Sequence, residues 1–224
     1  MDTAPLPWIH QTLSVPRFGR YLRTTAGDAD RAMQLYQWNL DVCEAFHSPL
    51  HWLEIPLRNA LHARLTTHFG LAEWWTLAEL APATASKIRD AEAGVRRRRP
   101  AGYQPDDVVA ALTFGFWVSL VSKTHTGSLW VPTLHGAFPH YRGPRHDLHQ
   151  SLESMRLFRN RIMHHEPIYH RDLVADRATI YRLIGYLSQD ALEVVPAVDR
   201  VPDILARRRS LWKEAYQAEA EVQQ

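Results

Sequence analysis

One stretch of the sequence combines side chains that could act on a phosphodiester. Arg156, Asn160 and His164 follow one another at intervals of four residues, so on a helix they form a stripe along one face. Arg159 lies one step around the helix from this stripe. RNA cleavage needs a base for the 2′-hydroxyl, an acid for the 5′-oxygen and cations for the charge on phosphorus. Histidine and arginine can serve these roles near neutral pH without a metal.

Chemistry alone leaves two other interpretations of this stretch open. Arginine, asparagine and histidine near a helix end can form a structural hydrogen-bond network that closes a helical bundle, and such networks resemble sites. A metal site is less well supported, because His164, His165 and His170 show no tetrahedral spacing with cysteine and the motif H-E-x-x-H is absent. We therefore expect no metal and no other cofactor.

The stripe needs a helix to hold it, and the sequence predicts one over about residues 147–165. Asp147 or Ser151 can begin this helix, and Pro167 stops it. The histidines at its C-terminus would feel a helix dipole that favours protonated imidazole. The apolar residues expected to face the core are Met155, Leu157, Phe158 and Ile162.

Apolar residues recur at helical spacing along most of the chain, and alternation with a period of two is hard to find. The sequence therefore predicts an all-α fold. Residues 1–19, with three prolines, are expected to form an extended N-terminal arm, and residues 20–222 a single domain. Residues 123–147 are expected to be a long connection. The other predicted helices cover about residues 28–46, 50–68, 82–96, 105–122, 174–192 and 202–217.

Composition excludes several classes of protein. The single cysteine, Cys43, rules out an internal disulfide framework. The most apolar stretch, residues 108–121, is shorter than the ~20 residues that a membrane span needs. The first residues show no secretory signal. We expect a cytoplasmic protein that does not enter a membrane.

The basic residues are almost all arginine. Only Lys87, Lys123 and Lys213 are lysine among the 26 basic residues. The excess reflects either codon bias or contact with phosphate groups, which a guanidinium binds with paired donors. The run of arginines at 96–99 is expected in a surface loop, where it is either solvated or an RNA clamp.

The string RNRIMHHEPI, residues 159–168, resembles a known family. Arg159 and His164 have the arginine–histidine spacing of the HEPN superfamily of helical ribonucleases, and the wider string is similar to the Abi-like branch of bacterial phage-defence proteins. Residues 35–62 resemble the N-terminal half of that family. The sequences LTFGFWVSLVS, LW and FP, which follow in the same order, resemble its middle.

The resemblance implies a HEPN-like helical bundle with additional N-terminal helices and a metal-independent endoribonuclease. Such a protein would act as a toxin in abortive infection, and an antitoxin or a small RNA could restrain it. HEPN domains usually pair, which implies a homodimer with a composite RNA-cleaving cleft. Arg159 and His164 would take the catalytic roles and Asn160 a supporting one. His165 and Glu166 belong to the family's string and would support the site or bind RNA.

Three further residues are candidates for supporting the site or binding RNA. Glu54 and Arg58 are spaced for an ion pair on one helix that could reach the motif, and Arg58 opens a shorter echo of it that ends at His62. Arg145 is expected beside the long connection, where Tyr141, Arg142 and His146 could also contact substrate.

Other functions remain open on the sequence alone. The chain could be a non-catalytic RNA-binding or regulatory module that keeps the fold. It could also be a structural dimer whose polar motif stabilises the interface, because breaking a buried charged network is costly. The echo that begins at Arg58 could be a degenerate second HEPN half.

Overall fold

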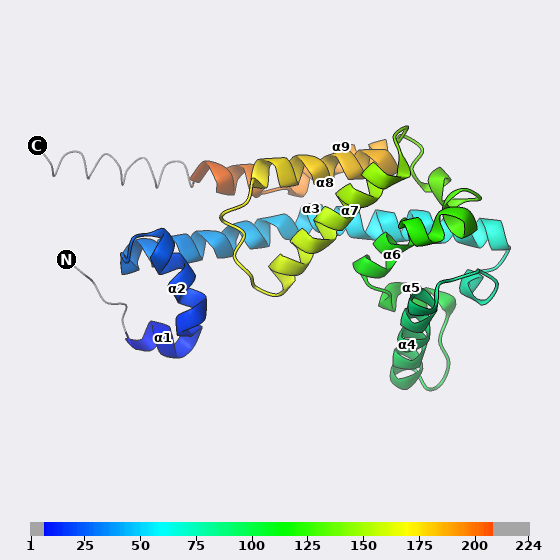
Figure 1. Cartoon of the computed structure of the whole chain (residues 1–224), viewed down its shortest axis with the longest axis horizontal. Coiled ribbons are helices and arrows are strands. Elements are labelled where there is room, and N and C mark those ends of the chain that lie inside the picture. Colours follow the sequence, from blue (N-terminus) through cyan, green and yellow to red (C-terminus); the bar gives the residue numbers. More distant parts are fainter. Residues whose placement is uncertain (1–6, 208–224) are drawn as a thin grey trace, which may run out of the picture. The chain divides into compact units, whose positions relative to one another are not determined.

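The computed structural model describes residues 7–207, and all regular secondary structure in this range is helical (Figure 1). The all-α prediction is thus confirmed. The longer helices are α1 (Pro7–Leu13), α2 (Val15–Thr24), α3 (Ala29–Phe69), α4 (Pro82–Arg98), α5 (Pro105–Ala111), α6 (Phe114–Leu120), α7 (Arg145–Met163), α8 (Leu173–Leu187) and α9 (Gln189–Val194). The short helical turns are η1 (Trp74–Thr76), η2 (Lys123–His125), η3 (Thr126–Trp130), η4 (Leu134–Ala137) and η5 (Val195–Val198).

Contacts divide the chain into two compact units, each assembled from separate stretches. Within the described range, unit 1 comprises residues 7–47, 165–173 and 199–207, and unit 2 comprises residues 48–164 and 174–198. The sequence instead predicts an N-terminal arm and a single domain. In the structure the chain leaves each unit and later returns to it. No described helix combines the length and the apolar character that crossing a membrane requires.

The N-terminal segment of unit 1 is helical and not an extended arm. Its prolines do not prevent this, because Pro7 begins α1 and Pro16 lies in the first turn of α2, where a missing N–H costs no helical hydrogen bond. Phe18 and Tyr21 of α2 are buried, and both rings lie close to that of Tyr36 on α3. Apolar burial therefore holds this segment in its unit.

Two predicted helices, 28–46 and 50–68, are one helix. α3 contains Pro49 and Pro56 in its interior, although an interior proline costs about 3 kcal/mol. On both sides of the prolines the helix carries buried apolar residues at helical spacing, which offset that cost. Gly70, with φ of +75°, follows its end. The fully buried members of this row are Val42, Phe46, Leu53, Leu57, Leu61 and Leu65.

In unit 2, the predicted motif helix, α7, has α6 as its neighbour. α6 packs against α7, and α4 packs against α5 and α6 (Figure 1). The predicted helix 105–122 is two helices, because Leu112 is extended and the Thr113 side chain accepts a hydrogen bond from Phe116 N–H to cap α6. The predicted helix 174–192 is likewise divided into α8 and α9, with Ser188 as the cap. Of the predicted last helix, 202–217, residues 202–207 lie within the described part of the chain and are helical.

Candidate functional site

A pocket of about 660 Å³ lies in unit 2 against one face of α7. The helix α6 and its flanks add Thr113, Gly115 and Ser119 to the wall, and α4 adds Lys87. The side chains that α7 contributes are His149, Glu153, Arg156, Arg159 and Asn160. The pocket therefore gathers three of the predicted site residues, Arg156, Arg159 and Asn160.

The spacing of apolar and polar residues orients α7. Residues 149, 153, 156 and 160 recur at intervals of four and three, so they share the face that lines the pocket. Leu152, Met155, Phe158 and Ile162 are buried on the opposite side. Leu157 was predicted to face the core, but it is 51% exposed, because it falls between the buried row and the polar stripe.

Arg156 lines the pocket and is paired with Glu153. Its Nε and Nη2 donate to Glu153 Oε2 and Oε1 at 2.7 and 2.5 Å. This pair raises the pKa of Arg156 and lowers the pKa of Glu153, so both stay charged at neutral pH. A Cβ at position 115 would lie only 3.2 Å from Arg156 Cδ, so Gly115 leaves room for the guanidinium arm to pass α6.

Arg159 is held from a different helix. Its Nε lies 3.4 Å from Glu54 Oε2 on α3, and that Nε is buried and makes no hydrogen bond in the described structure. Glu54 thus reaches the motif. The predicted ion pair between Glu54 and Arg58 does not form within the described residues, because Arg58 Nε donates to Asn59 Oδ1 at 3.2 Å instead.

The motif histidine stands apart from this pocket. His164 caps the C-terminus of α7, where its backbone N–H donates to Asn160 O at 2.9 Å, and its side chain is exposed. His165 follows with φ of +56°, the left-handed position that commonly ends a helix. None of His164, His165 and Glu166 is among the described residues that line the pocket.

The segment after the motif is fastened within unit 1 by a residue that the sequence analysis missed. Asn39 is 3% exposed, and its Oδ1 accepts hydrogen bonds from Ile168 N at 2.8 Å and Tyr169 N at 3.2 Å. Arg17 Nη1 also donates to His165 O at 3.3 Å. No spacing in the sequence links residues so far apart.

The residues proposed for substrate contact beside the long connection donate hydrogen bonds to backbone carbonyl groups. Arg145 Nη1 donates to Val121 O at 2.6 Å, and Arg142 Nη1 donates to Pro139 O at 2.6 Å. Tyr141 OH donates to Pro144 O at 2.8 Å. These bonds fix the entry to α7, and none of the three side chains lines the pocket.

His62, the last residue of the shorter echo, is partly buried and contacts Trp74 and Asp106. Trp74 Nε1 donates to His62 Nδ1 at 3.1 Å, and Asp106 Oδ1 lies 4.0 Å from Nε2. Burial lowers the pKa of His62, so a neutral ring accepts the indole N–H. The echo therefore does not present a second exposed histidine.

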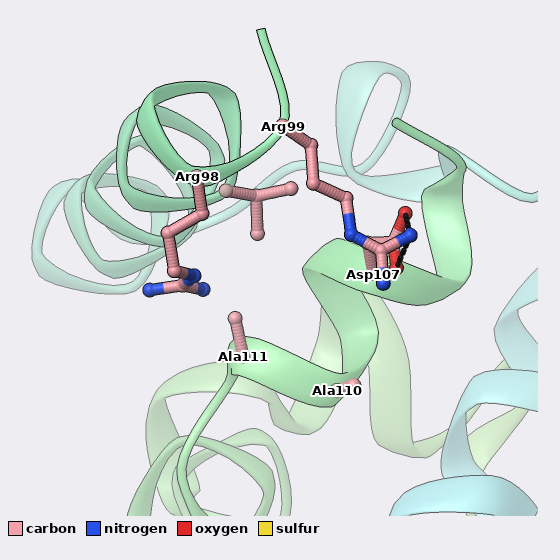
Figure 2. Close-up of a pocket in the computed structure, with 6 residues that line it drawn as sticks. Arg98, Arg99, Asp107, Ala110 and Ala111 are labelled. Carbon is pink, nitrogen blue, oxygen red and sulfur yellow. Dashed lines mark hydrogen bonds and ion pairs between the residues drawn. The ribbon is translucent and has the colours of Figure 1, made fainter. Parts of the chain in front are cut away.

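The arginine run ends a helix. Arg96, Arg97 and Arg98 form the last turn of α4, and only Arg99 begins the expected loop. A small pocket of about 220 Å³ lies here against α5 (Figure 2). Figure 2 shows Arg99 reaching toward Asp107, whose Oδ1 lies 3.0 Å from Arg99 Nη1. One of the two arginines at this pocket is therefore already neutralised.

Two pocket residues, His149 and Lys87, were missed by the sequence analysis. His149 could have been found by extending the stripe of Arg156 two turns toward the N-terminus. Burial lowers its pKa, and Arg145 and His146 lower it further, while Glu153 opposes them. Lys87 reaches the pocket from another helix, which no local spacing reveals.

Among residues 7–207, no group of three or more histidine, cysteine, aspartate or glutamate side chains could hold a metal ion. The larger pocket suits an anion, because Lys87 lines it without an ion-pair partner among the described residues. Arg156 and Arg159 also line it, and their charges are offset by Glu153 and Glu54. Comparisons of the chain with family models, with curated proteins and with solved structures find no match.

Proposed function

We propose that the chain is a metal-independent endoribonuclease of the HEPN type that cleaves RNA by attack of the 2′-hydroxyl. The observation that supports this function is the shared pocket of Arg156, Arg159 and Asn160, in which Glu54 anchors Arg159. A pocket rich in guanidinium groups and free of a carboxylate cluster matches the needs of a phosphodiester.

Each motif residue has a role in the proposed reaction. Arg159 stabilises the charge that builds on the phosphorane, and Asn160 orients or binds the phosphate. His164 transfers protons as acid or base. Its exposed position at the end of α7 leaves it open to a second copy of the chain, which agrees with a homodimer that forms a composite cleft.

The resemblance to Abi-like proteins supports the proposed setting. The enzyme would act in the cytoplasm as a toxin of phage defence, with RNA as its substrate. An antitoxin or a small RNA would hold it inactive until infection.

The test is cleavage of labelled RNA in EDTA by the wild type and by His164→Ala and Arg159→Ala. We expect the wild type to release products with a 2′,3′-cyclic phosphate and each variant to lose about 100-fold in rate. His51→Ala and Arg89→Ala are matched controls, because both residues are exposed and lie away from the pocket lining. Full activity of His164→Ala and Arg159→Ala would contradict the proposal.

One observation favours a second function, that of a non-catalytic RNA-binding or regulatory module. The pocket that holds Arg159 and Asn160 is not lined by His164. Such a module would bind RNA, lose binding in Arg159→Ala, and release no cyclic phosphate under any condition. Binding of a labelled oligonucleotide, measured beside the cleavage assay, separates the two functions.

A further inference from the structure

His149 is an imidazole inside the arginine-lined pocket, and the motif does not include it. It lies seven residues before Arg156 on the same face of α7, which places the two about 10 Å apart along the helix axis. Arginine side chains on a helix point back toward its N-terminus, and Arg156 does so to reach Glu153. The guanidinium therefore lies closer to His149 than the axial spacing suggests.

The ring of His149 is available to a ligand. It makes no hydrogen bond to any other described residue. Glu153 lies one turn further along α7, and both of its carboxylate oxygens accept hydrogen bonds from Arg156. The charged groups around His149 are Arg145, His146 and Glu153 on α7, and Lys87 lines the same pocket from α4. A phosphate in the pocket would meet cations and a free imidazole together.

The protonation state suits a base. Burial is the largest influence on His149 and lowers its pKa from the ordinary value; Arg145 acts in the same direction and Glu153 opposes it. The ring is therefore mostly neutral at pH 7, with one nitrogen able to accept a proton. An arginine cannot take this role, because it stays protonated.

We propose that His149 is the catalytic base of this pocket, taking the 2′-hydroxyl proton of an RNA whose phosphate is held by Arg156 and Lys87. This inference rests on the proposed function. The O2′–P bond forms as the proton moves to the imidazole. The P–O5′ bond breaks, and the 5′-oxygen takes a proton from water. The products are a 2′,3′-cyclic phosphate and a 5′-hydroxyl, and the imidazolium returns its proton to solvent.

His164 of the same chain does not replace His149 at this phosphate. It lies fifteen residues further along, about 22 Å along the helix axis. A group that moves a proton in this reaction must lie within about 3 Å of the oxygen it serves, so a histidine that far along the helix does not act at the same phosphate. The His164 that could assist here is that of a second copy, in the composite cleft proposed above.

The first test compares RNA cleavage by the wild type, His149→Asn, His149→Gln and the control His51→Asn between pH 5 and pH 8. We expect both His149 variants to lose about 100-fold in rate, and the rise in rate with pH below 6.5 to disappear in them. His51→Asn should match the wild type. Thermal unfolding of each variant shows whether the fold is kept.

The outcomes separate this inference from the proposed function. Loss of activity in His164→Ala with full activity in both His149 variants overturns the role of His149 and leaves the proposed function standing. Loss in the His149 variants alone supports the inference and removes His164 from the reaction. Full activity in all of these variants overturns both.

A second measurement does not depend on turnover. A 2′-O-methyl RNA octamer lacks the attacking hydroxyl, so it can be titrated against wild-type protein while the histidine ring signals are followed by NMR. We expect the His149 signals to move and its titration midpoint to rise as the phosphate approaches. Unmoved His149 signals, with or without binding elsewhere, would overturn the inference.

Discussion

At the scale of single residues, the position of Arg159 depends on Glu54. The carboxylate lies 3.4 Å from Arg159 Nε, and both side chains are partly buried, at 26% and 31% exposure. Their pair is therefore less screened than one on the surface. The motif supplies the arginine, but a helix far away in the sequence determines where its guanidinium points.

Replacing Glu54 by glutamine removes the charge and keeps the shape of the side chain. We expect Glu54→Gln to lower RNA cleavage about 10-fold, because Arg159 loses its anchor, while the free energy of unfolding falls by about 1 kcal/mol. Rates of cleavage and urea denaturation measure the two effects. Glu44→Gln, which breaks the exposed ion pair with Arg200, is the control and should leave cleavage unchanged. Equal rates for Glu54→Gln and the wild type would show that Arg159 is positioned without Glu54.

At the scale of elements, the segment that follows α7 is held by one buried amide. Asn39 on α3 accepts from the backbone N–H groups of Ile168 and Tyr169, the first buried and the second partly buried. We expect Asn39→Ala to lower the free energy of unfolding by about 2 kcal/mol, because one buried and one partly buried donor lose their acceptor. Denaturation in urea measures this loss.

The control for this prediction is Asn59→Ala on the same helix. Asn59 is exposed, and its described partner is the neighbouring Arg58, so its removal should change stability by less than about 0.5 kcal/mol. If Asn39→Ala were as mild as Asn59→Ala, the segment would have to be held by other contacts.

The helices were predictable where local rules decide them. Apolar spacing predicted the existence of α4 and α7, and the acids after Pro105 predicted the start of α5. The rules failed where burial outweighs them. Pro49 reads as a break, yet α3 continues through it, because apolar residues on both sides are buried. Proline-rich residues 7–24 are helical for the same reason.

The candidate site was predictable along one helix only. Arg156 and Asn160 share a stripe because four residues are about one turn, and the pocket contains both. Lys87 and Gly115 come from other helices, and their approach to α7 follows from tertiary packing that spacing does not encode. His164 was expected with them, but α7 ends before it, and the cap turns the chain.

At the scale of the whole molecule, three histidines of unit 2 link stability to pH. Burial lowers the pKa of His62, His125 and His149. Below a pH of about 6.5, the pKa of histidine in the unfolded chain, the unfolded chain binds protons that the folded chain does not bind. The contribution of these histidines to the free energy of unfolding is therefore fully present above this pH. It is lost as the pH falls toward their lowered pKa values in the folded chain.

We expect unfolding in urea at pH 5.5 to require less denaturant than at pH 7.5. His125 is 1% exposed and hydrogen-bonded to Thr84 at 3.0 Å, so it is the clearest single contributor. His125→Gln should flatten the pH dependence by at most about 1.4 kcal/mol per pH unit, which is the effect of one proton. The exposed His51→Gln is the control. An unchanged slope in His125→Gln would mean that folding does not lower the pKa of this ring.

The proposed composite cleft requires two copies of the chain to meet along α7. Leu157 is the residue of that helix best placed to contact a second copy, because it is 51% exposed and lies one position after Arg156, about 100° around the helix from it. The same side chain would stay in water in a monomer.

Leu157→Glu should therefore convert a dimer into a monomer and lower RNA cleavage, while leaving the helix content unchanged. Light scattering after size-exclusion chromatography gives the mass, and cleavage is measured at the same concentrations. Leu77→Glu is the matched control, because Leu77 is 61% exposed and lies after η1, away from α7. A wild-type monomer that cleaves RNA at a rate proportional to its concentration would refute the composite cleft and confine catalysis to the pocket of a single chain, where His149 is the imidazole at hand.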